Sequence, residues 1–384
     1  MKVAIVTPGG VDRSGTERVI PCLLWLIERF ERAGVEVHVY ALRQEPEPGR
    51  WQLRGAIVHN LGAGAGVARL WRALAAEHRI GRFDVIHCFW ALPSGAAAAL
   101  PARLLGIPLL LTLPGGDLVR DRAIGYGARL RWRDRVRLRL IVAAVHAVVV
   151  PSRAMRAQAG ALGIAATRIA FGVATDEWPA RPPAPRDRAA PIRLLHVASL
   201  NLVKDQATLL AAMARLAARK VAFTLDIIGE DILAGAVERE AAALGLGHCI
   251  RFHGFLPHSA LRRRVEQADL LVMSSRHEGA PIVLLEAAVA GVPTVGTAVG
   301  NIAEMAPHAA IAVPVGDSDA LADAVAALAL DEDARLRLAH AAQRSALAED
   351  SDWSAHQYLA LYRALAERRS YTRFTTAEAS RAAA

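Results

Sequence analysis

The sequence has few cysteines, almost no lysine and no apolar run long enough to cross a bilayer. Its three cysteines lie far apart, so they predict neither a disulfide framework nor a zinc site. The longest apolar run, over residues 141–150, is interrupted by His146 and is too short for a transmembrane helix. The first residues lack a secretory leader pattern, and we therefore expect a protein of the reducing cytoplasm.

Charge is distributed unevenly, and nearly all of the positive charge is arginine. Residues 1–190 hold 27 basic and 15 acidic side chains, whereas residues 191–384 hold 19 and 22. A basic first half predicts an anionic partner, such as a membrane surface or a phosphorylated acceptor. No recognised nucleic-acid-binding motif accompanies the arginines, so nucleic acid is not an expected partner.

The most informative stretch runs through residues 268–299. An apolar run (268–275) is followed by a loop with Gly279 and Pro281, a helix-like apolar segment (282–290) and a second apolar run (292–299). This order predicts a strand, a loop, a helix and a strand, which is a unit of parallel sheets.

Two carboxylates stand in this unit, Glu278 on the loop and Glu286 on the helix. Backbone N–H groups at a helix start hold anions, and carboxylates accept hydrogen bonds from hydroxyls. The pattern therefore favours a polyol bound beside a phosphate. The alternative is that both residues are solvated surface charges.

The sequence from Ser275 to Pro293 resembles the E-x7-E signature of retaining glycosyltransferases with the GT-B fold, family-4 type (glycosyl transferases group 1). The resemblance implies that Glu278 is catalytic and touches hydroxyls of the donor sugar. It implies that Glu286 binds the ribose of the nucleotide. The donor would also contact the segment between them, at Gly279, Ala280, Pro281 and Ile282.

Further donor-site residues follow from the same resemblance. Lys204 matches the lysine that binds the donor diphosphate and would be catalytic, while Ser199 stands where the family has an arginine. Gly15, in a motif like G-x-E, would bring its loop close to the diphosphate, although a plain turn glycine is an alternative. Glu304 ends a motif like G-G-x-x-E, in which Asn301 replaces the second glycine.

Residues 84–118 resemble the acceptor-side domain of these transferases. His87, Trp90 and Asp117 keep their motif positions and are candidate acceptor-side residues. A core histidine is an equally good interpretation of His87. Pro114 stands where the family has a histidine near the transferred sugar.

Residues 117–140 carry eight arginines between Arg120 and Arg139. Apolar residues alternate there with the period of a strand, whereas the family has a helix, and both interpretations stay open. A basic surface helix with a tryptophan would adhere to anionic headgroups, the alternative being a solvated arginine face. The candidate membrane contacts are Arg129, Arg131, Trp132, Arg133 and Arg135.

The expected architecture is α/β, the GT-B fold, with two Rossmann-like domains whose parallel sheets face each other across a cleft. The expected segments are an acceptor-side domain (1–178), a proline-rich linker (179–191), a nucleotide-sugar-binding domain (192–350), a helix crossing back to the first domain (351–370) and a tail (371–384).

The resemblance implies transfer of a sugar, with retention of anomeric configuration, from a nucleotide-diphosphate sugar to a lipid-linked, glycan or other acceptor. Cell-surface polysaccharide or glycolipid synthesis on the cytoplasmic face of the membrane is the expected setting, with no cofactor and no metal. Two alternatives remain. Pro114, Ser199, Ala174 and Asn301 depart from the family pattern, which fits a non-catalytic nucleotide-sugar-binding relative, and a sugar-nucleotide 2-epimerase would use the same fold.

Overall fold

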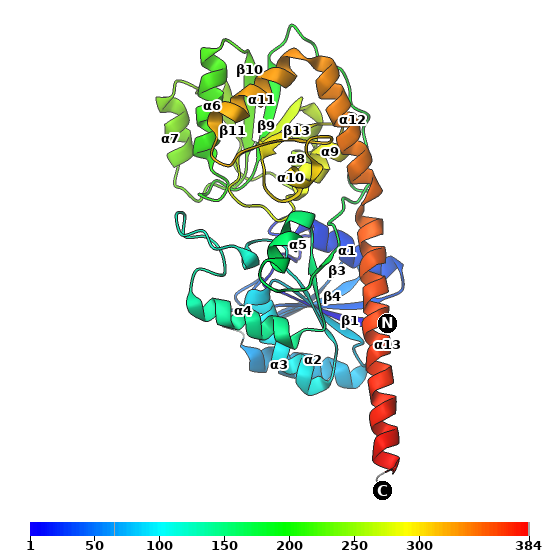
Figure 1. Cartoon of the computed structure of the whole chain (residues 1–384). Helices are drawn as coiled ribbons and strands as arrows, with labels where there is room; N and C mark the ends of the chain where they lie inside the picture. Colours follow the sequence, from blue (N-terminus) through cyan, green and yellow to red (C-terminus); the bar gives the residue numbers. More distant parts are fainter. Residues whose placement is uncertain (65, 383–384) are drawn as a thin grey trace. The chain divides into compact units, whose positions relative to one another are not determined.

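The computed structural model describes residues 1–64 and 66–382, with side chains as far as Glu367. The chain forms two compact units (Figure 1). The first consists of Met1–Pro151, Arg156–Ala170 and the C-terminal segment from Ser351, and the second of Ser152–Met155 and Phe171–Asp350. Each unit is a parallel or mainly parallel sheet covered by helices, which confirms the expected α/β class.

The sheet of the first unit has the strand order β3-β4-β2-β1-β5-β6-β7-β8, and every pair except β3 with β4 is parallel. All six side chains of β1 are buried, as expected for a strand covered on both faces. The strands are β1 (Lys2–Thr7), β2 (Glu36–Ala41), β3 (Gly49–Leu53), β4 (Ala56–Asn60), β5 (Val85–Phe89), β6 (Leu109–Thr112), β7 (Ala147–Val150) and β8 (Thr167–Arg168).

Two groups of helices cover this sheet. Helix α1 packs beside the long helix α13, and α3 lies between α2 and α4. Proline in the first turn of α1 suits a position whose N–H group would have no helical partner. The bounds are α1 (Pro21–Arg32), α2 (Val67–Ile80), α3 (Ala96–Leu105), α4 (Trp132–Ala144), α5 (Arg153–Gly160) and α13 (Ser351–Ala382).

A buried polar cluster fastens α13 to the sheet. The Tyr362 hydroxyl lies 2.6 Å from Nδ1 of His87 on β5, and Nε2 of His87 lies 2.7 Å from the Thr112 hydroxyl on β6. Tyr358 completes the cluster, with its hydroxyl 3.1 Å from that of Thr112. Burial lowers the pKa of His87 to about 3, so the ring is neutral at neutral pH. The last helix is therefore an integral part of the first unit.

The sheet of the second unit is entirely parallel, in the order β11-β10-β9-β12-β13-β14. Its strands are β9 (Ile192–Val197), β10 (Phe223–Ile228), β11 (Ile250–Phe252), β12 (Leu270–Met273), β13 (Thr294–Thr297) and β14 (Ile311–Val313). Its helices are α6 (Gln206–Ala218), α7 (Ala236–Ala243), α8 (His258–Gln267), α9 (Ile282–Val289), α10 (Gly300–Met305), α11 (Ser318–Leu330) and α12 (Glu332–Ala348).

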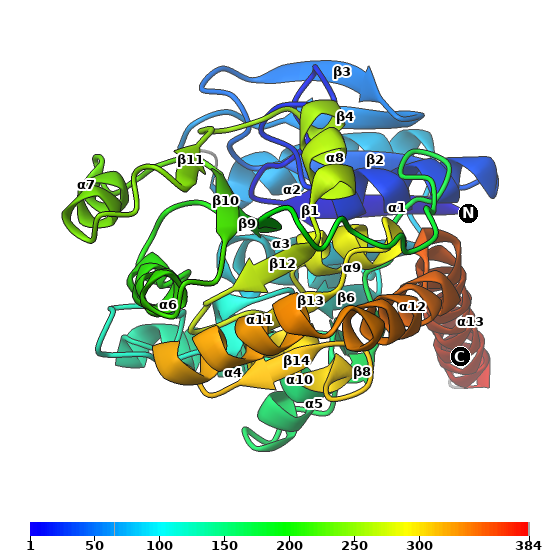
Figure 2. The ribbon, with the colours of Figure 1, turned by 90° about the horizontal axis from the view of Figure 1, so that it is seen from above.

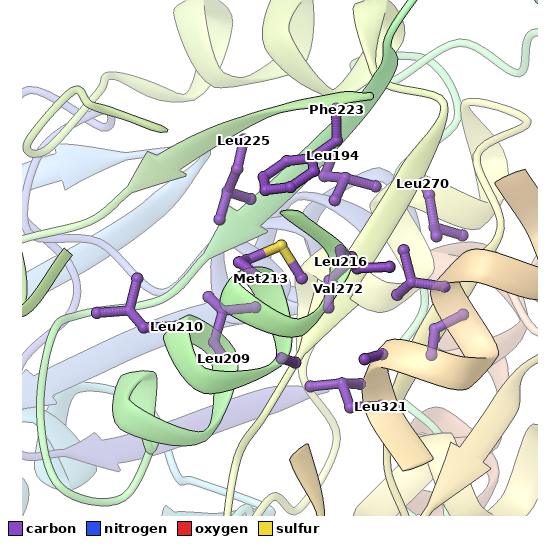
Figure 3. Packing of buried hydrophobic residues seen from close by; sticks show 14 of the residues in the cluster. Leu194, Leu209, Leu210, Met213, Leu216, Phe223, Leu225, Leu270, Val272 and Leu321 are labelled. Carbon is purple, nitrogen blue, oxygen red and sulfur yellow. The ribbon is translucent and has the colours of Figure 1, made fainter. Parts of the chain in front are cut away.

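Helices cover both faces of the second sheet, with α6 and α11 on one side and α8 and α9 on the other (Figure 2). Leu209 and Met213 of α6 and Leu321 of α11 are fully buried against strand residues such as Leu225 and Val272 (Figure 3). Helix α9 is also almost completely buried. Its own side chains are therefore apolar on nearly every face, and its sequence shows no amphipathic period.

The proline-rich segment 179–191 belongs to the second unit and is not a separate linker. Its backbone is hydrogen-bonded to that unit, because Arg181 N–H donates to the carbonyl of Val289 and Arg186 N–H donates to Glu332. The second unit takes up the chain from Phe171, whereas the expected first domain ended at residue 178 and the expected second domain began at residue 192. The expected tail also needs correction, since α13 continues past Tyr371 to Ala382. Residues 383–384 of that tail lie outside the described residues.

Replacing Tyr362 by phenylalanine tests the anchor of α13. The substitution keeps the ring but leaves Nδ1 of the buried His87 without its partner, which costs about 1–3 kcal/mol. We expect that loss in the free energy of unfolding measured in urea. The control is Arg363→Ala, an exposed neighbour on the same helix that should change stability by less than about 0.5 kcal/mol. Equal stability of the two variants would contradict the anchoring role.

Candidate functional site

The second sheet has a switch point between β9 and β12. From β9 the chain continues to β10 and β11 on one side, and β12 is followed by β13 and β14 on the other. The loops that leave the carboxyl ends of β9 and β12 therefore diverge. Ligands of open parallel sheets bind at such a divergence.

The structure brings the two predicted catalytic residues together at this point. Lys204 lies in the loop after β9 and Glu278 in the loop after β12, and Lys204 Nζ is 2.5 Å from Glu278 Oε1. The Ser275 hydroxyl donates to the same oxygen at 2.7 Å. The Lys204 side chain is 24% exposed and that of Glu278 is 9% exposed, so the pair is sheltered but open to a ligand.

Backbone contacts fix the two loops against each other. The Ser274 hydroxyl donates to the carbonyl of Lys204, and the N–H group of Arg276 donates to the carbonyl of Val203, both at 2.8 Å. Arg276 also lies 3.4 Å from Asp205, whose carboxylate caps α6 by accepting from Thr208. The position of the Lys204 side chain is thus set by the same loop that carries Glu278.

The start of α9 borders the pair. Pro281 is the N-cap residue and makes no side-chain cap, and Ile282 opens the helix. The loop before it, with Gly279 and Ala280, packs tightly against Gly300, which has a positive φ of 50°. A Cβ atom on Gly300 would lie 2.7 Å from the Gly279 carbonyl oxygen, so the backbones can approach this closely only without a side chain there.

Glu286 is almost completely buried and has a partner that the sequence did not indicate. Its Oε1 lies 2.7 Å from Nε2 of His258, at the first position of α8, and only 3% of its side chain is exposed. The ring of His258 packs against Trp178, whose indole N–H donates to the Glu286 carbonyl. No motif marks His258, because it lies 28 residues before Glu286 on another helix.

The other predicted donor residues of the second unit lie at the same edge. Ser199 is exposed just after β9, and its carbonyl accepts from the Gln206 amide at 3.3 Å. Glu304 lies on α10, where its carboxylate accepts from the N–H group of Arg153 at 2.7 Å. Each contact joins a side chain to a backbone group of another segment. The predicted ligand roles of Ser199 and Glu304 stay predictions.

Gly15 belongs to the first unit, in the loop between β1 and α1. It has a positive φ of 67°, and its N–H group donates to the carbonyl of Asp12. Earlier in the loop, Oε1 of the buried Gln44 accepts from the N–H groups of Gly10 and Val11, at 2.6 and 3.0 Å. Gln44 follows β2 and carries no motif, so sequence reasoning missed it.

Of the acceptor-side candidates, His87 is corrected to the core interpretation. Its side chain is fully buried and both ring nitrogens are hydrogen-bonded within the first unit, so no ligand can reach them. Trp90 is half-buried directly after β5. Asp117 is buried and accepts from the N–H group of Ala91 at 2.9 Å. Asp117 is thus hydrogen-bonded to the residue that follows Trp90.

The arginine-rich segment is helical from Trp132, which decides between the two interpretations. Trp132, Val136 and Leu140 follow one another at the helical spacing of four and are 63%, 44% and 66% exposed. Arg131 and Arg133 are exposed, while Arg129 and Arg135 are half-buried. The guanidinium of Arg122, together with those of Arg135 and Arg129, lowers the pKa of Arg120, as expected for crowded positive charge.

One cluster, away from both sets of loops, has the composition of a metal site. The potential ligand atoms of His38, His59 and Glu77 lie within 4.8 Å of one another. The ammonium group of Lys2 is already 2.8 Å from Glu77 and 2.9 Å from Glu36. This buried ammonium supplies the positive charge that the carboxylates need.

Comparisons with known proteins agree over most of the chain. Residues 182–345 match the family model of Glycosyl transferases group 1, and residues 19–171 match that of the Glycosyl transferase 4-like domain. Glycogen synthase of Mycobacterium tuberculosis is 31% identical over 281 residues, which are 72% of this chain and 67% of the relative.

Two solved structures show the same fold. Sucrose-phosphate synthase from Thermosynechococcus elongatus superposes with a TM-score of 0.81 at 20% identity, covering 95% of this chain and 99% of its own. Anabaena HepE in complex with UDP and glucose has a TM-score of 0.73 at 18% identity, with 95% and 100% covered.

The contact between Gly300 and the Glu278 loop yields a stability test. Gly300→Ala places a side chain at a positive φ and also brings its Cβ atom into a clash with the Gly279 carbonyl. Gly316→Ala places a side chain at a positive φ without a clash, because its Cβ atom would meet nothing within 4 Å. We expect a loss of about 1–2 kcal/mol for Gly316→Ala and a clearly larger loss for Gly300→Ala, measured by calorimetric unfolding. Equal losses of stability in the two variants would show that the loop with Gly279 moves away from residue 300 at no cost.

Proposed function

The chain belongs to the group 1 glycosyltransferases and has their GT-B fold, and from this premise we propose that its second unit binds a nucleotide-diphosphate sugar as donor. The observation that carries the proposal is the Lys204–Glu278 pair at the switch point of the second sheet. It joins a cation for a diphosphate with a carboxylate for sugar hydroxyls, at the start of a helix.

Each group has a distinct task in the proposed reaction. Lys204 and the backbone N–H groups at the start of α9 stabilise the negative charge that develops on the departing diphosphate. Glu278 accepts a hydrogen bond from a donor-sugar hydroxyl and so fixes the ring at the reacting carbon. Because positive charge comes from Lys204 and the helix start, the proposal needs neither a metal ion nor a cofactor.

We further propose that the anomeric configuration is retained. The bond between the anomeric carbon and the diphosphate oxygen breaks, and its electron pair passes to the diphosphate. The acceptor oxygen then bonds to the same face of the sugar, and its proton goes to the leaving phosphate. In this step Glu278 hydrogen-bonds to the sugar and forms no covalent bond with the anomeric carbon.

Glu286 is proposed to hold the ribose of the donor, with its position set by His258. The hydrogen bond to His258 and the contact of that ring with Trp178 leave the carboxylate a single orientation. A sheltered carboxylate in a fixed position forms strong hydrogen bonds with hydroxyls, because the local dielectric is low.

The acceptor is proposed to be lipid-linked or a glycan, met at an anionic membrane surface on the cytoplasmic side. The described helices contain none that is long and apolar enough to span a bilayer. Instead, α4 exposes an apolar stripe among arginines, and α3 beside it exposes Leu100 and Leu104 at 54% and 62%. Such a surface favours shallow insertion between anionic headgroups. Cell-surface polysaccharide or glycolipid synthesis is the proposed setting.

A nucleotide screen tests the donor site. We expect one of UDP, GDP and ADP to raise the melting temperature of the wild type by several degrees, since a ligand that binds only the native state stabilises it by mass action. Glu286→Gln should weaken that shift, each variant being compared with its own ligand-free melting temperature. The exposed Glu240→Gln, on α7 of the same unit, is the control and should keep the shift.

Glu278→Gln separates catalysis from binding. The amide can still accept from Ser275 but no longer neutralises Lys204, so the nucleotide shift should persist while transfer of sugar falls at least 100-fold, the scale on which one electrostatic group acts in catalysis. Product yield unchanged from wild type would remove the catalytic assignment. A nucleotide shift in a wild type that transfers no sugar would favour the non-catalytic alternative.

Co-sedimentation with anionic liposomes tests the membrane surface. Reversing Arg131, Arg133 and Arg135 to glutamate should release the protein, because each basic residue near such a surface contributes about 1 kcal/mol. The matched control reverses Arg251, Arg263 and Arg337, three exposed arginines of the second unit, and keeps the same net charge. Equal binding of both triple variants would rule out a specific role for α4.

A further inference from the structure

The turn after β5 holds a tryptophan in a conformation that glycine usually adopts. Trp90 has φ 66° and ψ 138°. Its N–H group donates to the carbonyl of Thr112 at 2.9 Å, and its carbonyl accepts from Gly95 at 3.0 Å. A residue with a large side chain persists in such a conformation only where its surroundings impose it, and such positions cluster at functional sites.

The Asp117 side chain is hydrogen-bonded to this turn. It lies in a short helical turn after β6 (Gly116–Leu118), is 3% exposed, and its Oδ1 accepts from the N–H group of Ala91, the residue after Trp90. Burial raises the pKa of this carboxyl group to about 6, against the lowering effect of the backbone N–H groups that it faces. Its Oδ2 is buried and has no hydrogen-bond partner among the described residues.

The turn lies where a ligand of the first sheet would bind. The strand order of this sheet reverses between β1 and β5, and Trp90 follows the carboxyl end of β5. The ring is only half-buried, so one part of it remains available. A tryptophan ring offers a large, rigid apolar surface at low entropic cost, which matches the C–H face of a saturated sugar or cyclitol ring.

We propose that Asp117 is a positioning residue that fixes the Trp90 ring as the platform on which a sugar or cyclitol ring of the acceptor stacks. The proposal rests on the proposed function, since it names the chemical class of acceptor that the first unit takes. Asp117 acts through the backbone of Ala91, the residue that follows the strained Trp90. The backbone conformation of the turn alone would be met by glycine at position 90.

Three variants separate these roles. Trp90→Gly suits the positive φ and removes only the ring, Asp117→Ala removes the acceptor for the Ala91 N–H group, and Asp117→Asn keeps it. The probe is methyl α-D-glucopyranoside, observed by saturation-transfer NMR. Hydrogen exchange of residues 89–95, followed by mass spectrometry, reports on the turn itself.

We expect saturation transfer in the wild type and in Asp117→Asn, and at least a tenfold loss in Trp90→Gly and Asp117→Ala. Exchange in residues 89–95 should accelerate at least tenfold in Asp117→Ala and stay slow in Asp117→Asn. Lost transfer with unchanged exchange in Asp117→Ala would assign direct binding to Asp117 and overturn the positioning role. Transfer that survives in Trp90→Gly, or is absent from the wild type, would overturn the platform.

The nucleotide-induced melting shift is measured on the same variants and should be unchanged. If the wild type shows no such shift, the donor proposal fails, while the exchange and NMR results still decide the role of Asp117. If the shift is present but the expected pattern of transfer is not, only the acceptor inference fails.

Discussion

The ion pair between Lys204 and Glu278 depends on a single topological fact, the adjacency of β9 and β12 in the second sheet. These strands are adjacent although 72 residues separate the end of β9 at Val197 from the start of β12 at Leu270, and the intervening β10 and β11 extend the sheet on the far side of β9. Three further features hold the loops that follow these two strands. Buried α9 and the close approach of Gly300 hold the Glu278 loop in place, and the hydroxyl of Ser274 fastens the Lys204 loop to it.

Much of this arrangement could be predicted from sequence, and the failures have physical causes. Residues 268–299 have an apolar pattern and breakers strong enough to give strand, loop, helix and strand in order. His258 and Gln44 were missed because each acts by a contact between distant segments, and neither stands in a motif. The proline-rich segment looked like a linker because its composition gives no periodicity, whereas hydrogen bonds to Val289 and Glu332 hold it in the second unit.

Sequence was least informative about side chains that serve the backbone. Gln44 and Asp117 are polar residues at the carboxyl edge of the first sheet, and each binds N–H groups of a neighbouring loop. His87 shows the converse, because a residue that fits a ligand-site motif has both nitrogens committed to Tyr362 and Thr112. A motif position specifies the residue type, but burial and partners decide whether a ligand can reach it.

The place of α13 in the first unit has a consequence for how the protein is made. The hydrogen bond between His87 and Tyr362 spans 275 residues of chain, and the second unit is contained entirely between them. On the ribosome, the second unit can therefore complete its core while the first sheet still lacks the helix that covers β5. Long-range closure of this kind is slow, and the apolar face of β5 stays unprotected during elongation. The first unit is thus the part of the nascent chain that completes its core last.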